Sequence, residues 1–128
     1  MKKITLFKLF TNDQDEAVRF YVDKLGFELA EDKKLGDYRW VVIRLPDNTE
    51  LTINLEIART DEEKALVGRQ AAGQPLFSLT TDDCLGEYAS LSARGVTFEG
   101  EPKKMPFGTG VMLRDLYGNK IYMLEEPS

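Results

Sequence analysis

Residues 6–13 read LFKLFTND, and residues 76–83 read LFSLTTDD. These two stretches decide the organisation of the chain, because five of their eight positions are identical at a spacing of 70 residues. Arg44 and Arg114 are separated by the same number of residues. A fixed spacing between similar segments is typical of an internally repeated structure. The sequence therefore predicts two copies of one structural unit.

Each copy continues with a predicted helix. The first begins at Asp13, where acidic residues suit the positive end of the helix dipole, and its apolar stripe continues to Leu25. Gly26 can cap its C-terminal end. The second helix covers residues 83–93 and is followed by Gly95. Both copies therefore pair a leading strand with an amphipathic helix.

Three short strands are predicted after each helix, which gives each copy the order βαβββ and the whole chain an α+β fold. They cover residues 27–30, 38–45 and 50–55 in the first copy and 96–99, 110–114 and 120–124 in the second. We expect a single domain, residues 1–128, made of two modules at about 3–56 and 75–125. A linker, residues 57–74, joins them and includes a short helix. Because each half is small, the modules are expected to share one core.

The composition excludes several kinds of chemistry. The 128 residues include no histidine, which removes the usual general base, the most common metal ligand and every Ser–His or Cys–His pair. A net charge of −5 argues against nucleic acid or an anionic membrane as the main partner. The single cysteine, Cys84, excludes an internal disulfide and fits a reducing compartment. Because no apolar run is long enough to span a bilayer, we expect a cytoplasmic protein without a membrane partner.

Five segments resemble the vicinal oxygen chelate superfamily, which includes glyoxalases, bleomycin resistance proteins and extradiol dioxygenases. They are 13–27 (DQDEAVRFYVDKLGF), 39–42 (RWVV), 50–54 (ELTIN), 82–96 (DDCLGEYASLSARGV) and 107–125, which contains DLYGN at 115–119. The combination FYxxxLGF with a later DxxGN is typical of this group. The resemblance implies paired βαβββ modules, a ligand cleft on the concave faces of the sheets, and a homodimer.

The resemblance also identifies the positions where metal-dependent relatives hold their metal. These positions are on the first and fourth strands of each module, and carried over they fall at Leu6, Glu50, Leu76 and Tyr122. A leucine has no lone pair to donate, and a single carboxylate does not make a divalent-metal site. We therefore expect neither a metal nor another cofactor.

Strand alternation predicts which side chains line the cleft, because successive residues of a strand point to opposite faces. The face away from the helix combines aromatic and apolar walls with polar groups such as Lys8 and Asn54, as small-molecule sites do. The candidate ligand-binding residues are Leu6, Phe10, Tyr38, Trp40, Arg44, Glu50, Phe107, Met112, Arg114 and Tyr122.

Several of these candidates have two interpretations. Trp40 is either a pocket wall or part of the core or of a dimer contact. Arg44 and Arg114 either bind an anionic ligand group or neutralise Glu50. Glu50 is either a general base, if an apolar cleft raises its pKa, or a carboxylate that contacts a cation or the ligand. Tyr122 either donates a hydrogen bond to the ligand or fills the cleft.

Other motifs predict local structure. Residues 106–110 (PFGTG) predict either a flexible loop or a close approach of the chain to a neighbouring strand, and residues 115–119 predict a turn. Cys84 follows two aspartates in the first turn of the second helix, and their charges oppose activation of its thiol.

Three functions remain open. The leading hypothesis is metal-independent binding of an aromatic or amphipathic small molecule, as in the bleomycin resistance branch, for sequestration of a drug or metabolite. The first alternative is a glyoxalase-like lyase or isomerase with Glu50 as its base. The second is an interaction module whose cleft is filled by Leu6, Leu76 and Tyr122.

Overall fold

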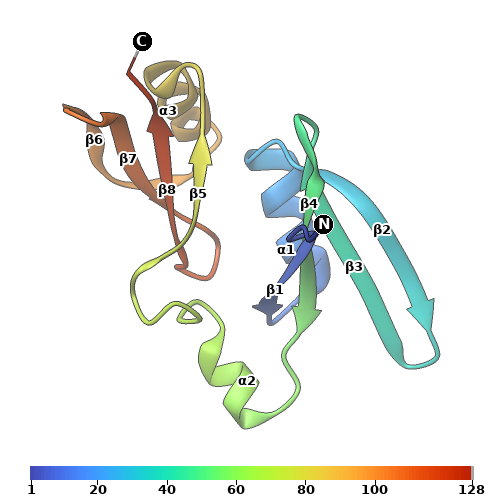
Figure 1. The fold of residues 1–128 in the computed structure, drawn as a ribbon. Coiled ribbons are helices and arrows are strands. Elements are labelled where there is room, and N and C mark those ends of the chain that lie inside the picture. Colours follow the sequence, from blue (N-terminus) through green and yellow to red (C-terminus); the bar gives the residue numbers. More distant parts are fainter. Residues whose placement is uncertain (128) are drawn as a thin grey trace. The chain divides into compact units, whose positions relative to one another are not determined.

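The computed structural model describes residues 1–127 (Figure 1). The chain divides into two units, Met1–Val67 and Gly68–Ser128, each with its own four-stranded sheet. No helix within the described residues is long and apolar enough to cross a membrane. The expectation that both modules share one core and form a single domain stays a prediction.

The two sheets have the same strand order and directions. The first has the order β1-β4-β3-β2 and the second β5-β8-β7-β6. In each, the leading strand runs parallel to the last strand, and the other neighbours are antiparallel. This symmetry confirms the α+β fold of two βαβββ modules. The strands are β1 (Leu6–Thr11), β2 (Glu28–Leu35), β3 (Tyr38–Leu45), β4 (Asn48–Ile57), β5 (Pro75–Thr80), β6 (Thr97–Met105), β7 (Gly108–Arg114) and β8 (Lys120–Glu125).

The first helix has two parts rather than the single predicted α-helix. Asp13 caps α1 (Gln14–Arg19) by accepting a 3.0 Å hydrogen bond from the Glu16 amide. The chain then widens into a π-helical turn, η1 (Phe20–Lys24), in which the Leu25 amide donates to the Phe20 carbonyl oxygen. Within this turn the rings of Phe20 and Tyr21 contact edge to face, with their centres 5.4 Å apart. Apolar periodicity alone did not reveal the π-helical turn.

The remaining helices fall where the sequence predicts them. A short helix, α2 (Asp61–Leu66), lies in the predicted linker, and α3 (Cys84–Ala93) follows β5. Asp83 caps α3 by accepting a hydrogen bond from the Gly86 amide at 2.9 Å.

Two strands continue well beyond their predicted ends. β2 reaches Leu35 and β6 reaches Met105, whereas the patterns ended at Ala30 and Glu99. The added residues are mostly exposed and charged, so they lack the apolar alternation on which the prediction depended. They are ordered by pairing with β3 and β7 instead.

In unit one, α1 covers one face of the sheet (Figure 1). The fully buried side chains facing this helix include Leu9, Val41, Ile43 and Leu55. The Gln14 side-chain amide donates to the Leu55 carbonyl oxygen at 2.9 Å and to that of Arg39 at 3.1 Å. These bonds fix the start of α1 on β3 and β4. We call the face turned away from α1 the far face.

Candidate functional site

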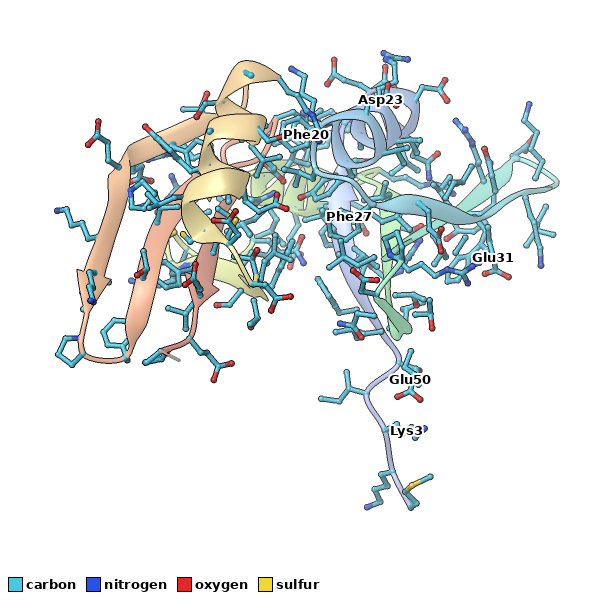
Figure 2. All side chains as sticks on the ribbon, turned by 90° about the horizontal axis from the view of Figure 1, so that it is seen from above. Lys3, Phe20, Asp23, Phe27, Glu31 and Glu50 are labelled. Carbon is cyan, nitrogen blue, oxygen red and sulfur yellow. The ribbon has the colours of Figure 1, made fainter. Side chains whose placement is uncertain are left out.

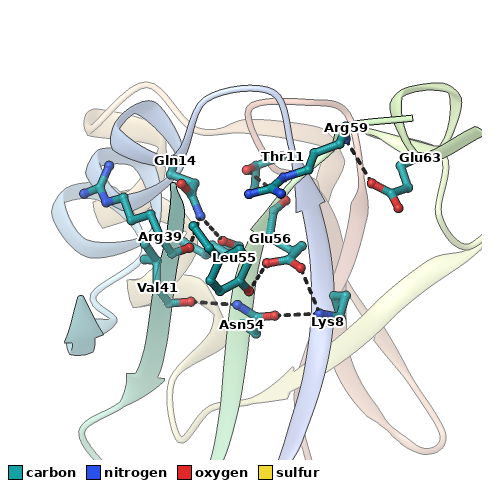
Figure 3. Close-up of polar contacts among 11 residues, drawn as sticks. Lys8, Thr11, Gln14, Arg39, Val41, Asn54, Leu55, Glu56, Arg59 and Glu63 are labelled. Atoms are coloured by element: carbon teal, nitrogen blue, oxygen red, sulfur yellow. Dashed lines mark hydrogen bonds and ion pairs between the residues drawn. The ribbon is translucent and has the colours of Figure 1, made fainter. Parts of the chain in front are cut away.

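Four polar side chains meet on the far face of the first sheet: Lys8, Tyr38, Asn54 and Glu56. We call them the Glu56 cluster (Figure 3). The strand register pairs Lys8 of β1 with Asn54 of β4, and Asn54 with Val42 of β3. Because alternate residues of a strand share a face, Glu56 follows Asn54 there. Three neighbouring strands thus converge on one carboxylate.

Every member of the Glu56 cluster is held by another. The Lys8 ammonium donates to Oδ1 of Asn54 at 2.9 Å and to Oε2 of Glu56 at 3.3 Å. The Tyr38 hydroxyl donates to Oε1 of Glu56. The fully buried amide of Asn54 also donates to the Val41 carbonyl oxygen at 3.1 Å, which satisfies it as burial requires. Both oxygens of Glu56 are therefore engaged.

The Tyr38 phenol is a neutral hydrogen-bond donor at physiological pH. Burial raises the pKa of Tyr38 to about 12, and the hydrogen bond and negative charge of Glu56 act in the same direction. The guanidinium carbon of Arg59 lies 5.3 Å from the centre of the Tyr38 ring, within cation–π range. The ring is therefore placed by Glu56 at its hydroxyl and contacted by a cation on its face.

Trp40 shares the far face with Tyr38, two residues further along β3, and is also fixed by a carboxylate. Its indole Nε1 donates a 2.7 Å hydrogen bond to Oε2 of Glu31. The hydrogen bonds from Trp40 and Lys33 lower the pKa of Glu31. The indole is half-buried, so part of the ring remains accessible while its polar atom is satisfied.

The two repeated arginines form equivalent ion pairs, but not with Glu50. Arg44 pairs with Glu28 of β2 at 2.7 Å, and Arg114 pairs with Glu99 of β6 at 3.0 Å. The expectation that they neutralise Glu50 is wrong, because in each module the edge strand supplies a closer carboxylate. These half-exposed pairs add little to stability.

The Glu50 side chain is exposed to solvent. It is 76% exposed, and its carboxylate is 3.3 Å from the Lys3 ammonium. Figure 2 shows these two residues together beside the segment that precedes β1, far from Phe20 and Phe27. The apolar surroundings that would make Glu50 a general base are not found around this exposed carboxylate.

The strand register also corrects the carried-over position of Glu50. Lys8 and Ser78 are equivalent by the 70-residue repeat, and they pair with Asn54 and Tyr122 respectively. The counterpart of Tyr122 is therefore Asn54, four residues beyond Glu50. Strand alternation could not reveal this difference, because positions 50 and 54 are both even-numbered and are therefore assigned to the same face of the sheet.

The residues at the ligand positions do not fit a divalent metal. Leu6 and Leu76 offer no donor atoms, and Asn54 and Tyr122 offer a neutral amide and a phenol. Across residues 1–127, no group of three or more His, Cys, Asp or Glu side chains is placed to hold a metal ion.

In unit two, Tyr122 of β8 pairs with Met112 of β7, and the Tyr122 ring lies over Gly110. A Cβ at Gly110 would lie 2.0 Å from the Tyr122 hydroxyl oxygen, so the ring occupies the space left by the glycine. At Gly108 a Cβ would lie 2.3 Å from the Glu125 carbonyl oxygen. The close approach predicted for PFGTG is confirmed.

The alternative prediction for PFGTG, a flexible loop, is wrong. β6 ends at Met105 and β7 begins at Gly108, so only a two-residue turn separates them. Phe107 lies in that turn and is 56% exposed.

Of the remaining candidates, Leu6 is 39% exposed, and Phe10 is half-buried on the same strand.

The late motif at residues 115–119 forms the predicted turn. The buried Asp115 carboxylate accepts 2.9 Å hydrogen bonds from the amides of Tyr117 and Asn119 and from the Asn119 side chain. These hydrogen bonds give the motif a structural role.

Cys84 is fully buried, and burial, Glu125 and Asp83 raise the pKa of its thiol, which agrees with the expected lack of activation.

Two residues of the site escaped prediction. The predicted strand ended at Leu55, and one further residue of alternation would have placed Glu56 on the same face as Asn54. Arg59 follows the strand in an irregular segment, and no periodic signal marks it. The position of its guanidinium over the Tyr38 ring depends on the direction that the chain takes after β4.

Comparisons with known proteins agree with this geometry. The model of the Glyoxalase/Bleomycin resistance protein/Dioxygenase superfamily matches residues 3–123. An uncharacterized protein of Shewanella frigidimarina is 37% identical over 119 residues, which cover 91% of this chain and 88% of that one.

Two solved structures are similar along almost their entire length. UcmS2 has a TM-score of 0.86 and 30% identity, covering 97% of this chain and 98% of its own. TnmS3, described as an antibiotic binding protein from Streptomyces sp. CB03234, has a TM-score of 0.83 and 28% identity, covering 99% and 98%. The chain therefore belongs to the Glyoxalase/Bleomycin resistance protein/Dioxygenase superfamily.

Proposed function

We propose that the protein binds an aromatic or amphipathic small molecule without a metal and thereby sequesters it. The observation that carries this proposal is the pair of aromatic side chains on the far face of β3. Tyr38 and Trp40 are each fixed by a carboxylate, and each leaves part of its ring accessible. A planar ligand would stack on rings already held in place, which reduces the entropy lost on binding.

Two further observations support a binding protein over an enzyme. The metal-ligand positions hold Leu6, Asn54, Leu76 and Tyr122, which suit contact with an organic molecule better than with a metal. The similarity to TnmS3, an antibiotic binding protein, favours an antibiotic-like ligand. No observation favours Glu50 as a base or a module filled by its own side chains. The homodimer and the cytoplasmic location remain predictions.

A thermal-shift screen against antibiotics and aromatic metabolites tests this function. A true ligand at 100 times its Kd should stabilise the protein by about 2.7 kcal/mol. Trp40→Ala should abolish the shift, whereas Trp40→Phe, which keeps a ring and loses the bond to Glu31, should retain part of it. A shift that survives Trp40→Ala would place the ligand elsewhere.

The enzymatic alternative has its own test. Purified protein should contain no stoichiometric metal and should not turn over methylglyoxal with glutathione. Stoichiometric zinc or nickel, or turnover that Glu50→Gln removes, would contradict the proposed function and favour a lyase.

A further inference from the structure

Arg59 is the exposed charge beside the Glu56 cluster. Its guanidinium carbon lies 5.3 Å from the Tyr38 ring centre, and the residue is exposed. Among residues 1–127, no carboxylate lies within ion-pair distance of this guanidinium. Figure 3 shows the side chain reaching back from the end of β4 toward Glu56. A cation is thus placed next to aromatic surface with its hydrogen-bond donors available.

The nearby negative charges are already engaged. Glu56 is only 18% exposed and accepts from Lys8 and Tyr38. Glu63 accepts a 2.9 Å hydrogen bond from the Arg59 backbone amide and lies on the other side of that residue from the guanidinium (Figure 3). An incoming ligand therefore meets a positive group rather than a negative one, although the chain as a whole carries −5.

We infer that Arg59 binds the carboxylate of an aromatic carboxylic acid whose ring packs on Tyr38 and Trp40. The inference rests on the proposed function and specifies the ligand class for the far face of the first sheet. A guanidinium donates two parallel hydrogen bonds to a carboxylate. The contact with the Tyr38 ring restricts the conformations of the guanidinium before the ligand binds. The positive site also rejects cationic aromatic compounds.

Three matched probes test the inference: 2-naphthoate, 2-naphthamide and 2-naphthylmethylammonium. They share a ring system and differ in charge, and Trp40 fluorescence or calorimetry reports their binding. Naphthoate should bind about tenfold more tightly than naphthamide, as a charge-assisted hydrogen bond implies, and the ammonium more weakly still. The preference for naphthoate should also decrease with added salt.

Variants separate a specific contact from general charge. Arg59→Gln should make naphthoate and naphthamide bind equally, whereas Arg59→Lys should keep part of the preference. Arg19→Gln removes the same charge from α1, on the opposite side of the sheet, and should change nothing. Urea unfolding verifies that each variant is folded.

The outcomes distinguish this inference from the proposed function. Equal binding of naphthoate and naphthamide to the unsubstituted protein, with both lost in Trp40→Ala, would overturn the role of Arg59 and leave the small-molecule site in place. Tighter binding of the ammonium probe would overturn the inference as well. If none of the three probes binds while an antibiotic produces a Trp40-dependent thermal shift, the ligand class is wrong and the binding function holds.

Discussion

The ring of Tyr122 occupies the space that a side chain at Gly110 would need, since a Cβ there would lie 2.0 Å from the hydroxyl oxygen and 2.5 Å from Cζ. The two residues lie on the neighbouring strands β7 and β8. The glycine is therefore required by a particular ring and not by its backbone conformation.

Gly110→Ala should destabilise the protein by about 1–3 kcal/mol, the usual cost of overpacking, because the ring must move. Urea unfolding measures this cost. In a Tyr122→Ala background the same substitution should cost much less, which a double-mutant cycle detects. An equal cost in both backgrounds would show that the ring is not the obstacle.

The buried turn at Asp115 supports a second prediction. Asp115→Asn should lower the free energy of unfolding by about 2 kcal/mol or more, because the strong hydrogen bonds to a charged carboxylate are replaced by weaker bonds to a neutral amide. The new amide would also place a donor against the Asn119 side-chain amide, which now donates to Asp115 at 2.9 Å. Chemical denaturation measures the loss. Asp82→Asn, at an exposed position, should be nearly neutral, and equal losses would contradict this account.

Some features could be predicted from the sequence because they depend on local periodicity. β3 begins and ends at the predicted residues Tyr38 and Leu45, and the residues at which two helices were predicted to begin, Asp13 and Asp83, are their N-terminal caps. The hairpin extensions of β2 and β6 were missed, since pairing with a neighbouring strand orders residues that carry no apolar pattern.

The site was less predictable than the fold for a related reason. Alternation assigns a residue to a face of the sheet, but it does not say which residue lies beside which. Only the register revealed that Asn54, and not Glu50, is the counterpart of Tyr122. Likewise, the partner of Arg44 is Glu28, which belongs to a different strand from the expected Glu50.

The Trp40–Glu31 hydrogen bond predicts a fluorescence change in acid. The bond from Trp40 is the main cause of the lowered pKa of Glu31, whose ordinary value is 4.5. Because the folded-state pKa is depressed, the stabilisation is complete above 4.5 and is lost as pH falls through the lower folded-state value. The emission of Trp40, the only tryptophan, should therefore change with a midpoint below 4.5.

A variant pair assigns that transition. Glu31→Gln should remove it, while Glu62→Gln, on the exposed surface of α2, should leave it in place. If the transition persists in Glu31→Gln, another acid is responsible and the indole is not reporting on this bond.

Tyr38 predicts the alkaline behaviour of the protein. Burial, aided by Glu56, raises its pKa from 10 to about 12, so the folded state favours the neutral phenol. The associated stabilisation is complete below pH 10 and is lost as pH rises through about 12. Ultraviolet absorbance of tyrosinate should show a component that titrates near pH 12, and Tyr38→Phe should remove that component. Glu56→Gln should lower its midpoint, because the negative charge that opposes ionisation of the phenol is lost. Glu63→Gln removes the same charge nearby without a contact to Tyr38, so an equal decrease in that variant would refute the specific role of Glu56.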